Sequence, residues 1–159
     1  MNTLLLMLLL GSNSISLTSA DFANNGNIPA KFTCEGKNIS PELSISGVPP
    51  EAVTLALVVD DPDADKTIIT HWIVWNIPAN TNTIKQNSKP GTEGKNEKGA
   101  NAYMGPCPPT DTHHYHFNIY ALDRRIDLPA GSTKEQLLKA IEGHIIASGE
   151  LIGLYKKEK

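Results

Sequence analysis

Three clusters of polar residues in the sequence have side chains that could do chemistry. The first is a run of four aspartates within Asp60–Asp65, directly after an apolar stretch. Carboxylates this close repel one another, so those that turn away from water need hydrogen-bond donors or a cation. An Asp-Pro turn that simply ends a strand is the ordinary alternative. The run lacks the Gly and Glu positions of an EF-hand, which argues against that calcium site.

The second and third clusters are rich in histidine. His71 stands before Trp72, and a lone histidine in a strand is more often a core residue than a ligand. The third cluster begins with the turn Tyr103–Pro109, whose prolines hold the N–H groups of Gly105 and Cys107 in place. Rigid turn backbone of this kind can form an anion-binding concavity. The chain continues with His113, His114, Tyr115 and His116.

Metal binding and catalysis are the alternatives to anion binding. A zinc site would need His71, Asp61 and one histidine of the third cluster, but the sequence has no His-x-x-x-His or Cys-x-x-Cys spacing. Asp61, His71 and His113 are residue types used in general acid–base catalysis. The sequence has no Gly-x-Ser-x-Gly elbow, and Cys107 lies between two prolines. We therefore favour binding and predict no cofactor.

The elements that would position these clusters are mostly strands. Short β-branched, aromatic and apolar runs between turn signals predict strands at 15–18, 39–45, 53–59, 68–77, 115–122 and 147–155. The 53–59 run is apolar throughout and predicts a buried central strand. Side chains alternate between the two faces of a strand, so His113, Tyr115 and Phe117 are predicted on one face, and His114, His116 and Asn118 on the other.

One helix is predicted near the end of the chain. Ser132 and Glu135 have capping-box spacing, and apolar residues follow at helical intervals up to Ile145, with Gly143 expected to break the helix. The polar, Gly-rich segment Ala79–Ala102 predicts a long functional or mobile loop. Strands without regular helix alternation predict a mainly β protein, an antiparallel β-sandwich.

Length and charge limit the function classes. The chain has 159 residues, which favours a single domain, and its formal net charge is −3. A nucleic-acid-binding domain would be basic, and the cluster of lysines at Lys156–Lys159 is typical of a solvated tail. We predict no nucleic-acid partner.

The N-terminal end predicts a leader. Leu4–Leu10 is an apolar run too short to span a bilayer but long enough for a signal-peptide core, although no Lys or Arg precedes it. We predict a leader over residues 1–14 rather than a cut after Ala20, since the later cut would delete the strand at 15–18. Export to the periplasm or medium is favoured, with the cytoplasm as the alternative. Cys34 and Cys107 would pair after export and stay thiols in the cytoplasm.

Several motifs together resemble the phosphatidylethanolamine-binding protein family, most of all its bacterial branch. The motifs are Asp61-Pro62-Asp63-Ala64, His71-Trp72, Gly105-Pro106-Cys107-Pro108-Pro109 and His113-His114-Tyr115, in the family's order and context. The openings at Ser19–Phe22 and Asn38–Pro41 and the ending at Gly143–Tyr155 are similar too, so the family-like domain is predicted over 15–157.

The resemblance implies a Greek-key β-sandwich with a few peripheral helices and a small anion pocket. The implied ligand-binding residues, by motif, are Asp61, Asp63, His71, Gly105, Cys107, Pro108, His113 and Tyr115. The implied ligands are phosphate or a phosphorylated head group such as phosphoethanolamine, with at most peripheral membrane contact. Inhibition of a kinase or a protease is also implied.

Two departures from the family pattern affect this expectation. Asp65 replaces the usual Pro and adds negative charge, and His114 replaces the usual Arg, which loses a permanent charge and a bidentate donor. The histidines are expected to donate to the anion when protonated, so affinity should rise as pH falls. The alternatives are a protein-interaction module that does not use its pocket, and a weak hydrolase that depends on His and Asp.

Overall fold

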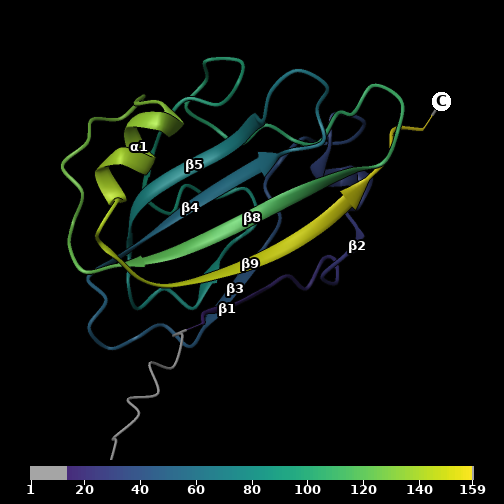
Figure 1. Cartoon of the computed structure of the whole chain (residues 1–159). Helices are drawn as coiled ribbons and strands as arrows, with labels where there is room; N and C mark the ends of the chain where they lie inside the picture. The colour runs from purple at the N-terminus through teal and green to yellow at the C-terminus, as the bar shows by residue number, and fades with distance from the viewer. Residues whose placement is uncertain (1–13, 159) are drawn as a thin grey trace, which may run out of the picture.

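The computed structural model describes residues 14–158, and the predicted leader lies outside them except for Ser14. Two sheets form the body of the chain (Figure 1). The larger has the order β2-β9-β8-β4-β5-β7 and the smaller has the order β1-β3-β6. The large-sheet strands are β2 Gly26–Asn27, β9 Ile145–Tyr155, β8 His113–Leu122, β4 Thr54–Asp61, β5 Ile69–Pro78 and β7 Thr92–Glu93. The small-sheet strands are β1 Ser16–Thr18, β3 Leu43–Ser46 and β6 Thr83–Ile84.

The large sheet contains a Greek key. Strands β4, β5 and β7 are antiparallel neighbours in chain order, with β6 of the small sheet between β5 and β7 along the chain, and β8 returns to pair antiparallel with β4 on its other side. The resulting order β8-β4-β5-β7 is the 4-1-2-3 arrangement of that motif. The predicted fold class, a mainly β Greek-key sandwich with few helices, is confirmed. The described helices are the 3₁₀ turn η1 Ala30–Phe32 and α1 Lys134–Ile141.

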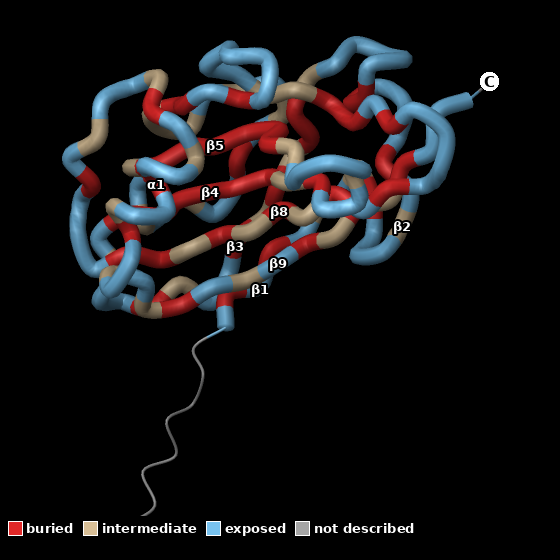
Figure 2. The backbone as a smooth tube through the Cα atoms, turned by 45° about the horizontal axis from the view of Figure 1, so that its top comes forward, coloured by how far each residue is buried: buried red, intermediate tan, exposed pale blue. Residues whose placement is uncertain are grey.

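Strand β4 is buried on both faces, which explains its unbroken apolar sequence. Leu55, Leu57 and Val59 belong to the core between the two sheets. Ala56 and Val58 belong to a second cluster on the other face, which α1 covers with Leu137 and Ile141. Figure 2 shows β4 and β5 buried through most of their length. Each fully buried large apolar side chain contributes about 1.5–3 kcal/mol. Because β4 lies inside the sheet and is buried on both faces, the prediction of a buried central strand is confirmed.

The start of α1 differs from the prediction. Thr133, not Ser132, is the N-cap: its hydroxyl accepts from the Gln136 N–H, and the Gln136 side chain accepts from the Thr133 N–H. The Ser132 hydroxyl donates instead to the carbonyl of Pro129. The helix ends at Ile141, before Gly143 with φ +77°, as predicted. Ile145 begins β9 and is not part of the helix.

The segment Ala79–Ala102 is more ordered than the predicted loop. It contributes β6 to the small sheet and β7 to the large one. Ile84, Glu93 and Asn96 are buried, and the Glu93 carboxylate accepts from the Trp72 indole N–H at 3.0 Å. Some polar residues of this segment are therefore buried and make contacts in the core. Within residues 14–158, no helix is long and apolar enough to cross a membrane.

Candidate functional site

A cavity of about 330 Å³ opens at the end of the large sheet where β4 finishes and β5 and β8 begin. The antiparallel pairing of these strands brings Asp61, the last residue of β4, to the same end of the sheet as His113, the first residue of β8. Seven of the eight predicted ligand-binding residues line the cavity: Asp61, His71, Gly105, Cys107, Pro108, His113 and Tyr115. Asp63 is the predicted residue that does not.

Asp61 orients His113. The Asp61 carboxylate is buried and accepts from His113 Nδ1 at 2.7 Å and from the Asp63 N–H at 2.9 Å. With Nδ1–H donated to Asp61, the Nε2 atom of a neutral His113 ring is a hydrogen-bond acceptor.

Asp63 has a different partner. Its carboxylate accepts from the backbone N–H of His114 at 2.8 Å and from His114 Nδ1 at 2.6 Å. The side-chain hydrogen bond from His114 lowers the pKa of Asp63. The pair lies on the exposed side of the strand, so Asp63 and His114 anchor the 61–65 turn to β8 outside the cavity. Asp65 is exposed and does not line the cavity either.

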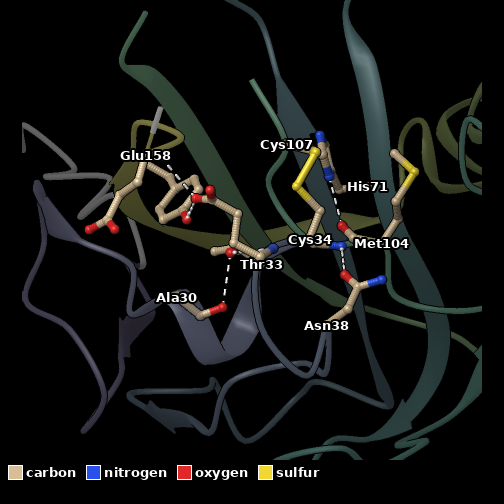
Figure 3. Close-up of a disulfide and its surroundings, with 11 residues drawn as sticks. Ala30, Thr33, Cys34, Asn38, His71, Met104, Cys107 and Glu158 are labelled. Carbon is tan, nitrogen blue, oxygen red and sulfur yellow. Dashed lines mark hydrogen bonds between the residues drawn. A yellow bond between two sulfur atoms is a disulfide. The ribbon is translucent and has the colours of Figure 1, made fainter. Parts of the chain in front are cut away.

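His71 is held by the third cluster. Its Nδ1 donates to the Met104 carbonyl at 2.7 Å, and the Met104 N–H donates back to the His71 carbonyl at 2.9 Å. Figure 3 shows this contact beside the disulfide. Burial lowers the pKa of His71 from 6.5, although the Met104 carbonyl and Asp61 raise it. The ring is therefore neutral at neutral pH, and its Nε2 accepts rather than donates.

The 104–109 turn supplies fewer free N–H groups than expected. The Gly105 N–H donates to Asn38 Oδ1 at 2.7 Å, so it is not available to an anion (Figure 3). A Cβ at Gly105 would collide with that same Asn38 oxygen, which explains the glycine. The Cys107 N–H is the turn donor that remains at the cavity, and it lies close enough to the Tyr115 hydroxyl to lower its pKa, against the larger effect of burial.

The Tyr115 hydroxyl is buried and makes no hydrogen bond of good geometry among the described residues, although the Cys107 N–H and the Asp61 carboxylate lie near enough to act on its pKa. Burial, and then the negative charge of Asp61, raise the pKa of Tyr115, so the hydroxyl stays protonated. The ring is fixed by an edge contact with His71, with centroids 5.1 Å apart, and by stacking with His113 at 6.5 Å. A buried hydroxyl without a partner is a donor ready for a ligand.

A disulfide forms part of the cavity wall. Cys34 and Cys107 are bonded, which is one of the two alternatives that the sequence leaves open. The bond ties the segment after η1 to the 104–109 turn, where the Cys34 N–H also donates to the Pro106 carbonyl. The Tyr103 hydroxyl adds a third link, to the carbonyl of Phe32.

Among the lining residues that are absent from the sequence-based set, Lys98 and Asn38 are the two with polar side chains other than the disulfide-bonded Cys34. Lys98 lies in the polar segment 79–102, where several lysines have no distinguishing pattern. Asn38 lies in a motif that the family resemblance includes, but nothing in that motif indicates a contact with Gly105. Over residues 14–158, no group of three or more His, Cys, Asp or Glu side chains is arranged to hold a metal ion.

Known proteins resemble this chain over nearly its whole length. The sequence model described as phosphatidylethanolamine-binding protein matches residues 18–156. A UPF0098 protein of Methanothermobacter thermautotrophicus is 43% identical, with 90% of this chain and 99% of that protein covered. A UPF0098 protein of Pyrococcus horikoshii is 45% identical, with 93% and 80% covered. Since both are archaeal, the likeness is not confined to bacteria.

Two solved structures have the same fold. A phosphatidylethanolamine-binding protein homolog of Chlamydia trachomatis has a TM-score of 0.88 and 42% identity, with 92% of this chain and 100% of that chain covered. YbcL of Escherichia coli, described as a member of the mammalian family, has a TM-score of 0.84 and 28% identity, with 91% and 99% covered. The chain belongs to the phosphatidylethanolamine-binding protein family.

Proposed function

We propose that the cavity binds a small anionic group, a phosphate borne by a larger molecule or free. The observation that carries this proposal is the Tyr115 hydroxyl, which is buried at the cavity, protonated and without a partner. A buried donor in that state costs about 1–3 kcal/mol, and an acceptor oxygen of a ligand would recover this cost. The backbone N–H of Cys107 is a second donor beside it.

The two cavity histidines make the proposed binding depend on protons. Nδ1 of His71 and Nδ1 of His113 are both engaged, so each ring can offer only Nε2 to a ligand. Nε2 accepts in the neutral ring and donates in the imidazolium. Anion binding therefore favours protonation, and affinity should rise as pH falls. For His71 the rise should level off only below 6.5, where the free ring is itself protonated, because burial lowers its pKa.

The family supports the same chemistry. The head group named in the family description carries a phosphate and an amine, and phosphoethanolamine reproduces that head group without its lipid. The UPF0098 names of the relatives assign no activity. The proposal therefore rests on the cavity, with the family as support.

Calorimetry tests the proposal with methyl sulfate, methyl phosphate and phosphoethanolamine. Methyl sulfate stays a monoanion across the pH range, so any pH dependence of its affinity belongs to the protein. We expect saturable binding that strengthens from mildly alkaline to mildly acidic pH and that His71→Gln weakens. His116→Gln is the matched control, because His116 pairs with Glu150 and does not line the cavity.

Three results would contradict parts of this proposal. Absence of binding to all three ligands would refute the proposal that the cavity is an anion site. Binding that does not change with pH would rule out the histidines as donors to the anion. Turnover of methyl phosphate that His71→Gln abolishes would favour the hydrolase alternative instead.

A further inference from the structure

The charges around the cavity do not favour an anion by themselves. Asp61 contributes a buried carboxylate to the lining. Asp60 and Glu97 are near enough to His71 to raise its pKa, although burial outweighs them and His71 stays neutral at neutral pH. An anionic ligand would thus enter a negative potential, and its Coulomb energy needs a compensating cation.

Lys98 is the one lysine or arginine among the described residues that line the cavity. The lysine and arginine side chains in ion pairs with described carboxylates are those of Lys89, Arg124 and Lys134, and Lys98 is not among them. Its ammonium group is therefore not committed to an internal partner. The side chain is exposed, which suits a residue at the cavity mouth.

A turn centred on Asn96 places Lys98 there. The buried Asn96 side chain accepts from the backbone N–H of Lys98 at 3.0 Å and of Ala100 at 3.1 Å, and it donates to the Ala102 carbonyl at 2.8 Å. The Glu97 N–H donates to the Thr70 carbonyl at 2.9 Å. Thr70 directly precedes His71, so this bond fixes the turn beside the cavity.

We infer that Lys98 supplies the permanent positive charge of the site and makes it select dianionic groups over monoanionic ones. The inference rests on the proposed function and specifies its ligand: a phosphate monoester rather than a sulfate ester or a carboxylate. Coulomb energy is proportional to the ligand's charge, so one cation adds twice as much binding free energy for a dianion. The ratio of the two affinities therefore depends on Lys98.

The test compares methyl phosphate with methyl sulfate, which have the same shape and different charge, at a pH of about 8, where a phosphate monoester is a dianion because its second pKa is about 6. At low ionic strength we expect Lys98→Gln to weaken methyl phosphate binding roughly tenfold and methyl sulfate binding roughly threefold. Lys98→Arg keeps the charge and should stay close to wild type. Added salt should shrink both losses.

Lys95→Gln is the matched control, because Lys95 is an exposed lysine on the same segment that does not line the cavity. It should bind both ligands as wild type does, and all three variants should keep the wild-type thermal midpoint. Any of three results would overturn the inference: unchanged affinities in Lys98→Gln, equal losses for the two ligands, or an Lys98→Arg variant that binds as weakly as Lys98→Gln. In each of these cases wild-type binding would still support the proposed function. A wild type that binds neither ligand would refute both.

Discussion

Removal of the Tyr115 hydroxyl should stabilise the ligand-free protein. The hydroxyl is buried without a partner, and such a group costs about 1–3 kcal/mol. Tyr115→Phe removes that group and keeps the ring, with its contacts to His71 and His113. We expect the free energy of unfolding to rise by about 1 kcal/mol, the lower end of the range, because water that enters the cavity satisfies the hydroxyl part of the time.

Tyr103→Phe is the matched control with the opposite sign. The Tyr103 hydroxyl is also buried, but it donates to the Phe32 carbonyl at 2.8 Å. Its removal leaves that carbonyl without its donor and should lower the free energy of unfolding by about 1–2 kcal/mol. Urea unfolding in phosphate-free buffer measures both variants. In a protein of this length, 1 kcal/mol corresponds to about 2–4 °C in the thermal midpoint.

The same Tyr115→Phe change should weaken ligand binding. A hydrogen bond to a charged acceptor contributes about 1.5–3 kcal/mol, so methyl phosphate affinity should fall at least about tenfold. Stability and affinity would then change in opposite directions, as expected for a donor kept for a ligand. A Tyr115→Phe protein destabilised as much as Tyr103→Phe would show that the hydroxyl is already satisfied, and unchanged affinity would show that it does not touch the ligand.

Three further predictions concern stability. Burial lowers the pKa of His71, so the unfolded chain binds this proton at higher pH than the folded chain, and the free energy of unfolding should fall as pH drops below 6.5. Urea unfolding at several pH values should show a smaller fall in His71→Gln, and the same pH dependence in both proteins would contradict the prediction. Reduction of the Cys34–Cys107 disulfide, with a sequence separation of 73, should cost about 4 kcal/mol on the loop-entropy model, measured by denaturation with and without reductant against a double Cys→Ser variant. The Lys134 ammonium binds both oxygens of the half-buried Asp60, so Lys134→Met should cost about 3 kcal/mol at neutral pH, and adding Asp60→Asn should restore most of it; a double variant as unstable as the single one would refute this account.

The long strands could be predicted from the sequence, and the short elements could not. The 53–59 run predicts β4 because an unbroken β-branched and apolar stretch of that length fits a strand buried on two faces. Strands β6 and β7 have two residues each, too few for any periodicity. Strand β3 begins at Leu43, later than the predicted residue 39, after Pro41, which has no N–H to give to a ladder.

The N-cap of α1 shows a similar limit. Ser132 and Thr133 are both good caps, and each has an acceptor side chain three residues later. The carbonyl of Pro129 decides between them, because it takes the Ser132 hydroxyl and leaves Thr133 to cap the helix.

The sequence by itself determined the residue types of the site and the face of β8 that carries His113 and Tyr115, because strand alternation is a local property. Only the tertiary structure decided which neighbours these residues meet. Asp61 bonds His113 across 52 positions, while Asp63, two residues on, turns outward to His114. His71 bonds the Met104 carbonyl and Gly105 bonds the Asn38 side chain, and these partners lie in segments far away along the chain. Such contacts depend on how those segments pack together, and no local pattern encodes that packing.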